Sequence, residues 1–104
     1  MSDLTFVDGL DVLDPTDGDG PHIQRLAAGS GVTVVRLGFT AGQVMDRHRA
    51  RVPIMVQGVV GRVEFSTASS TQTLVPGTAV LVDAEVEHRL EATADSVLTL
   101  LVLR

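Results

Sequence analysis

Short strand-like runs follow one another along most of this chain, and they constrain its fold more than any other feature. The runs are rich in Val, Leu and Thr, and Gly or Pro stands at many of the breaks. They recur roughly every eight to twelve residues, which is typical of an all-β sandwich or barrel. No window of about ten residues has a convincing helical periodicity. The predicted strands are residues 22–28, 31–39, 43–50, 53–57, 59–66, 71–75, 78–83, 86–92 and 96–103.

Alternation along two of the later runs predicts which side chains face the interior. In the run EHRLEA, His88, Leu90 and Ala92 share one face and charged residues occupy the other. In GRVEF, Val63 and Phe65 oppose an Arg and a Glu. Because successive side chains point to opposite faces of a strand, the apolar face is the interior one. His88 is therefore predicted to point inward.

The run around His48 follows the same rule. Its row of Arg47, Arg49 and Arg51 is expected to lie in solvent and to pair with glutamates of neighbouring strands. His48 then points inward, and with His88 it is predicted to face one cavity. The interior-facing side chains of this run are predicted to be Val44, Asp46, His48, Ala50, Val52 and Ile54.

Composition removes several kinds of chemistry. The chain has no Cys, which excludes thiol catalysis, thiolate ligands and disulfides, and it has no Lys, which excludes Schiff-base chemistry. The reactive side chains that remain are three His, the carboxylates, the hydroxyls and eight Arg. Of the histidines, His22 has no evident partner and is expected to be structural.

The negative charge belongs to the N-terminal segment. Residues 1–20 contain six Asp and no basic residue, whereas the rest has seven acidic residues against eight Arg. Neither part offers the clustered basic surface that a phosphate backbone requires, so nucleic acid is not an expected partner. We predict an acidic N-terminal arm over residues 1–21 and a single β-domain over residues 22–104.

The apolar segments are too short for a membrane. The longest one, residues 97–103, falls far below the length of a membrane-spanning helix, and the first residues do not resemble a signal peptide. A cytoplasmic protein without a membrane partner is expected. Because the run SVLTLLVL is apolar on both faces, it needs a second covering layer. We predict a homodimer, with coverage by the chain's own N-terminal arm as the alternative.

Two stretches resemble the two recurring motifs of the cupin family. The first family motif has Gly, His-x-His, Glu and Gly in order, and the chain matches its spacing without a gap through Gly42, His48, Ala50, Ile54 and Gly61. The second has Gly, Pro-x-Gly, His and Asn, and the corresponding residues are Gly77, Asp83, Glu85, His88 and Ala92. The resemblance covers about residues 31–103. It implies an all-β, cupin-type antiparallel β-barrel with a jelly-roll-like sandwich.

The resemblance also identifies a metal position that is altered in this chain. In metal-binding cupins the two His and the Glu of the first motif and the His of the second hold the metal. Here His48 and His88 remain, and Ala50 and Ile54 replace the other two. Two imidazoles fall short of the three protein ligands usual for a catalytic divalent ion, so no cofactor is expected. The alternative is a two-His, one-carboxylate site for Fe, Mn, Ni or Zn, formed by His48, His88 and Asp46.

A small apolar interior suggests two classes of function. The first is a module that binds a small organic ligand, oriented by the two histidines. The second is a small enzyme, either metal-dependent in the manner of cupin oxygenases, isomerases and decarboxylases, or using His48 and His88 as general acid and base. Asp83 and Glu85 are expected at the rim of the barrel, in water. Beside the two histidines, the predicted pocket residues are Asp46, Ala50, Ile54, Val63, Phe65, Leu81 and Leu90.

Overall fold

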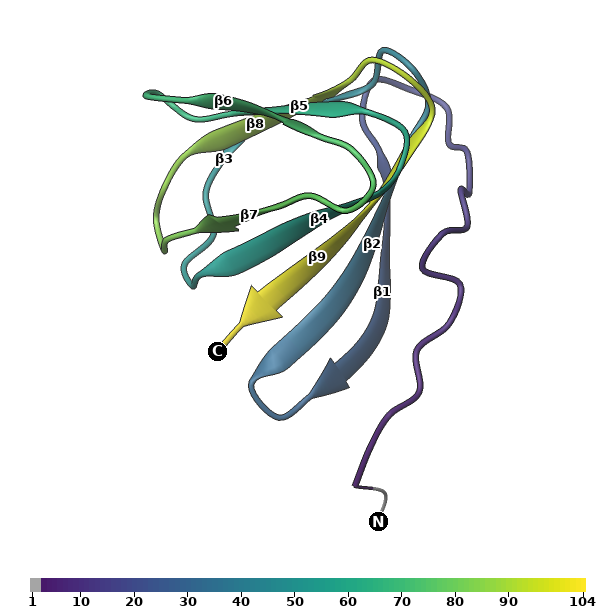
Figure 1. Cartoon of the computed structure of the whole chain (residues 1–104), viewed down its shortest axis with the longest axis vertical. Coiled ribbons are helices and arrows are strands. Elements are labelled where there is room, and N and C mark those ends of the chain that lie inside the picture. The colour runs from purple at the N-terminus through teal and green to yellow at the C-terminus, as the bar shows by residue number, and fades with distance from the viewer. Residues whose placement is uncertain (1–2) are drawn as a thin grey trace.

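The computed structural model describes residues 3–104, which form two antiparallel sheets (Figure 1). The larger sheet has the order β1-β2-β9-β4-β7 and the smaller has the order β3-β8-β5-β6. The strands are β1 (His22–Gly29), β2 (Val32–Phe39), β3 (Val44–His48), β4 (Ile54–Val60), β5 (Val63–Ser66), β6 (Thr71–Leu74), β7 (Ala79–Val82), β8 (His88–Ala92) and β9 (Ser96–Leu103). The predicted all-β class is confirmed.

The break after the fourth predicted strand was placed wrongly. The sequence suggested a break at Gly58, but β4 continues through this residue to Val60 and turns at Gly61. Gly58 is needed for another reason, because a Cβ there would lie 2.2 Å from the carbonyl oxygen of Val75. The β4–β9 pairing is irregular between Gly58 and Val60, as expected where a glycine admits a close backbone contact.

The core lies between the two sheets and is almost entirely aliphatic. Its residues come from both sheets at alternate positions, as the period-two pattern predicted. Phe39 and Phe65 are the aromatic members. The other buried members are Val35, Leu37, Ile54, Val56, Val63, Leu74, Val82, Leu90, Ala92 and Leu98.

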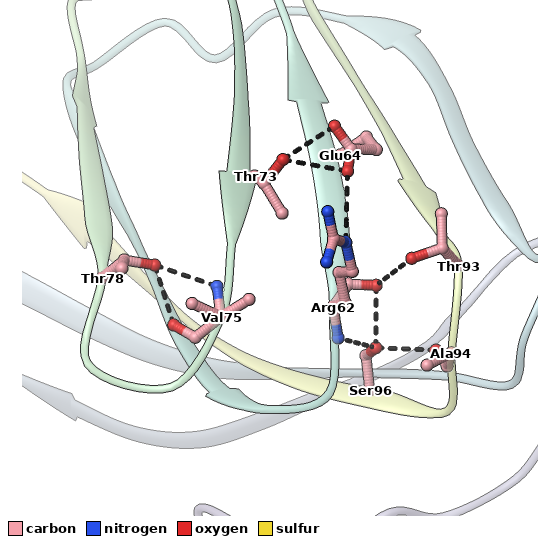
Figure 2. Close-up of polar contacts among 8 residues, drawn as sticks. All are labelled: Arg62, Glu64, Thr73, Val75, Thr78, Thr93, Ala94 and Ser96. Carbon is pink, nitrogen blue, oxygen red and sulfur yellow. Dashed lines mark hydrogen bonds and ion pairs between the residues drawn. The ribbon is translucent and has the colours of Figure 1, made fainter.

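One end of the sandwich is closed by a group of polar contacts between two turns (Figure 2). The buried Ser96 hydroxyl donates to the carbonyl oxygen of Ala94 at 2.7 Å and accepts a hydrogen bond from the backbone N–H of Arg62 at 2.8 Å. These bonds join the turn before β5 to the turn before β9. The sheets lie close together at this end and spread apart at the opposite end (Figure 1), where β3 ends and β8 begins.

The predicted N-terminal arm contains no strand over residues 3–21, and residues 1–2 lie outside the described residues. Arg36 of β2, only 7% exposed, donates to the carbonyl oxygen of Gly9 and to the carboxylate of Asp14, both at 2.7 Å. Gln43 donates to the carbonyl oxygens of Thr16 and Gly18. The arm is therefore bound to the domain by buried side chains. Residues 3–104 include no helix that could cross a membrane.

Candidate functional site

His48 and His88 face each other at the open end of the sandwich. They are directly opposite in the antiparallel pairing of β3 with β8, and their ring centroids are 4.3 Å apart with the rings inclined at 65°. His48 is exposed, whereas only 3% of His88 is accessible. The pair therefore extends from the protein surface to the interior.

A bulge in β3 determines which of its side chains face inward. Met45 pairs with Leu90 and His48 pairs with His88, so three steps along β3 match two steps along β8. The extra residue shifts the alternation, and Met45 and His48 consequently share the interior face although they are three positions apart in the chain. The sequence prediction assumed unbroken alternation, and it was wrong in leaving Met45 out of the interior-facing side chains.

The bulge turns Asp46 outward, contrary to prediction. Its side chain is 88% exposed, its carboxylate accepts the backbone N–H of Arg47 at 2.8 Å, and it lies 3.8 Å from Nε of Arg89. The structure therefore does not bring this carboxylate together with His48 and His88. Both the predicted pocket and the predicted two-His, one-carboxylate metal site needed it beside them.

Both histidines are held by the same local hydrogen bond. Nδ1 of His48 lies 2.8 Å from the carbonyl oxygen of Asp46, and Nδ1 of His88 lies 2.9 Å from that of Val86. A carbonyl oxygen can only accept, so Nδ1 carries the proton in each ring. In the neutral form of each ring, Nε2 is left as an acceptor.

The surroundings of His88 favour its neutral form. Burial lowers the pKa of His88 below its ordinary value of 6.5; the hydrogen bond to the Val86 carbonyl opposes this shift, and the charge of a protonated His48 adds to it. The Phe65 ring stacks on His88 with centroids 5.3 Å apart and planes inclined at 16°. The aromatic ring on this side carries no negative charge that would stabilise a protonated His88.

Behind the pair lies a cavity of about 150 Å³, here called the interior cavity. The histidines are its polar residues, and the others are aliphatic or Met. Of the predicted pocket residues, Ala50, Ile54 and Leu90 line it. The sequence analysis missed the remaining lining residues, which are Leu37, Met45, Val56, Leu100 and Val102.

Three other predicted pocket residues do not line the interior cavity. Leu81 is 77% exposed, because Val80 and Val82 on either side of it point into the sandwich. Val63 is fully buried in the core. Phe65 is also buried and stacks on His88; with Leu81 it lines a different pocket, of about 320 Å³.

Strand periodicity carried enough information to find most of the missed residues. Val56 lies two positions after Ile54, and Leu100 and Val102 occupy alternate positions of β9. Following period two along every strand, rather than only along the motif strands, would have included them. Met45 could not be found in this way, because nothing in the run VMDRH marks the bulge.

The loops around the site are bound to each other. Glu85 has a left-handed φ of 70°, and its backbone N–H donates to the carbonyl oxygen of Ala50 at 2.8 Å. Glu87 pairs with Arg47 at 3.8 Å and with Arg49 at 3.6 Å on the outer surface. Arg47 and Arg49 thus lie in solvent, as predicted.

His22 begins β1 in the other sheet and does not line the interior cavity.

The residues present do not suit a resident divalent metal. Within residues 3–104 no group of three or more His, Cys, Asp or Glu side chains is placed to hold one. Ala50 and Ile54, at the positions of the missing ligands, provide no donor atoms. Two imidazoles against an apolar wall supply too few ligands and too little compensation for the dehydration of a divalent ion.

This architecture defines the class: the chain has the cupin fold, as its motifs predicted. An RmlC-like cupin protein from Desulfovibrio desulfuricans matches it with a TM-score of 0.83 and 14% identity, over 96% of this chain and 97% of that one. For KdgF from Halomonas sp. the TM-score is 0.77 and the identity is 21%, over 96% of this chain and 94% of that one. For a cupin superfamily protein from Desulfitobacterium hafniense the values are 0.76 and 14%, over 95% and 98%. No protein-family model and no curated protein matches the sequence.

The lowered pKa of His88 predicts an acid-dependent loss of stability. Near pH 6.5 the unfolded chain takes up a proton at this residue and the folded protein does not. The free energy of unfolding should therefore fall as the pH drops below this value, and this contribution should be constant above it. Urea unfolding measures the free energy of unfolding at about pH 7.5 and at about pH 5.5. The decrease between these two pH values should be smaller for His88→Gln than for the wild type.

The matched control is His48→Gln, which removes the charge of His48 and leaves the stacked Phe65 ring on His88 in place. Since burial is the largest cause of the shift, this variant should keep most of the acid-dependent fall. An identical pH dependence in the wild type and in His88→Gln would contradict the assignment.

Proposed function

We propose that this protein binds a small organic molecule in the interior cavity, with the polar end of the ligand at His48 and His88. The observation that carries the proposal is the cavity itself, which combines aliphatic walls with a single pair of polar side chains at its mouth. Apolar walls supply affinity, and a few fixed polar groups supply orientation. Both rings are already fixed by backbone hydrogen bonds, so little ordering accompanies binding.

The size of the interior cavity limits the ligand. A cavity of about 150 Å³ with aliphatic and aromatic walls is large enough for benzene in other proteins. The interior cavity has this volume. A ligand with an apolar body of about one six-membered ring therefore fits, and a dissociation constant of about 1 mM or tighter is expected for so small a molecule.

Phenol is a suitable probe of this function, and Ala50→Leu should weaken its binding about tenfold or more. Ala50 lines the cavity, and a larger side chain there fills space that the ligand needs. Ala68→Leu is the control, because Ala68 is exposed and does not line the interior cavity. Calorimetric or NMR titration measures both. Failure of the wild type to bind phenol, or unchanged binding by Ala50→Leu, would contradict the proposal.

We also propose that the outer face of the larger sheet packs against a second copy of the chain. The strand register aligns Ala27, Val34, Leu101, Met55 and Leu81 in one apolar row across all five strands. The central strand of this sheet is β9, so a two-fold axis that runs parallel to β9 at Leu101, between the two packed faces, exchanges the two ends of the row. Such an axis places Leu81, 77% exposed, opposite the β1–β2 end of the partner, where residues 3–5 and 7 of the arm also lie.

Leu81→Asp should convert this dimer to a monomer in light scattering coupled to size exclusion. An exposed side chain contributes little to the fold of one chain, so the variant should remain folded. Ile23→Asp is the control: Ile23 is 57% exposed but lies on the opposite face of the same sheet, in register with Leu37. A monomeric wild type would contradict the proposal, as would dissociation caused equally by both variants.

A further inference from the structure

We infer that the ligand is a neutral hydroxyl compound with a ring-sized apolar body, and that its O–H donates to Nε2 of His88, the buried member of the histidine pair. The inference rests on the proposed function and adds the chemistry of the ligand's polar end. It follows from which ring nitrogen carries the proton in His48 and His88.

In their neutral forms the two histidines offer acceptors and no donors to the interior cavity. Each Nδ1–H is already used by a backbone carbonyl two residues earlier in the chain. Neither Nε2 atom has a hydrogen-bond partner among residues 3–104. The other lining residues have no strong hydrogen-bonding side-chain group, since a Met thioether accepts only weakly. A ligand that satisfies this site must therefore donate.

The acceptor atom of His88 is not fully enclosed by protein. Within the described chain, Nδ1 of His22 is the only fully buried side-chain N or O without a hydrogen-bond partner. Nε2 of His88 also lacks a hydrogen-bond partner, but it is not among the fully buried atoms. It therefore keeps some accessible surface, although only 3% of the residue is exposed. His88 lines both the interior cavity and a smaller pocket of about 40 Å³, and of these two only the interior cavity is large enough to bring a ring-sized molecule to this residue.

Other ligand classes fit the site less well. An anion would find no donor at the neutral pair, and the nearby Arg47, Arg49 and Arg89 pair with carboxylates on the outer surface. A pure hydrocarbon would remove water from Nε2 and return no hydrogen bond, which is costly for a buried acceptor. A phenol or a small alicyclic alcohol meets both requirements, because it combines an apolar ring with one O–H donor.

The test compares phenol with toluene, anisole and benzoate at about pH 8, where imidazole is neutral. Toluene replaces the hydroxyl by a methyl group, anisole retains the oxygen without its proton, and benzoate carries a charge. Phenol should bind about tenfold or more tightly than toluene and anisole, and benzoate should not bind measurably. Equal binding of phenol and toluene would overturn this inference and leave the proposed function intact. Failure of all four to bind would overturn both.

A variant and a spectroscopic measurement test whether the preference for phenol over toluene arises from His48 and His88. His88→Phe removes the buried acceptor and should abolish the preference of phenol over toluene, whereas His22→Gln should retain it. Long-range ¹H–¹⁵N spectra of the wild type distinguish protonated from unprotonated ring nitrogens without a substitution. Nε2 of both rings should be unprotonated, and that of His88 should shift on addition of phenol. Protonated Nε2 atoms, or a phenol preference that persists in His88→Phe, would overturn the inference.

Discussion

The extra residue in β3 determines what the interior of this sandwich can bind. It turns Met45 and His48 to the same side and turns the carboxylate of Asp46 into solvent. Without the bulge, an acidic side chain would point toward the two imidazoles and a thioether would lie outside. With it, the carboxylate accepts the N–H of Arg47 within the bulge, and the interior receives an apolar side chain.

The fold could be predicted from the sequence because strand alternation and turn residues act locally. The nine strands of residues 3–104 were all predicted, and the inward orientation of His88 followed from period two, whereas the face of β3 that His48 shares depends on the bulge. The site was predicted only in part. The bulge depends on the register between β3 and β8, and Leu81 faces outward because of the phase set by Val80 and Val82. The amino-acid composition of one strand reveals neither the bulge in β3 nor the outward direction of Leu81.

The same two histidines can serve different chemistry according to their neighbours. Imidazoles whose Nδ1–H is fixed by a carbonyl present Nε2 to whatever lies in front of them, and this arrangement is also the one that orients metal ligands. In this chain the neighbours are Ala50 and Ile54, so the space in front of Nε2 is apolar. The stacked Phe65 ring and the lowered pKa of His88 act in the same direction, toward a neutral His88.

The central claim is that two imidazoles beside apolar side chains do not retain a divalent ion. Elemental analysis of protein without a histidine tag, incubated with Mn, Fe, Ni or Zn and then desalted, tests it most directly. The account predicts well below one metal per chain for the wild type, and an increase for the double variant Ala50→His and Ile54→Glu. About one metal per chain in the wild type, lost on His48→Ala or His88→Ala, would contradict it.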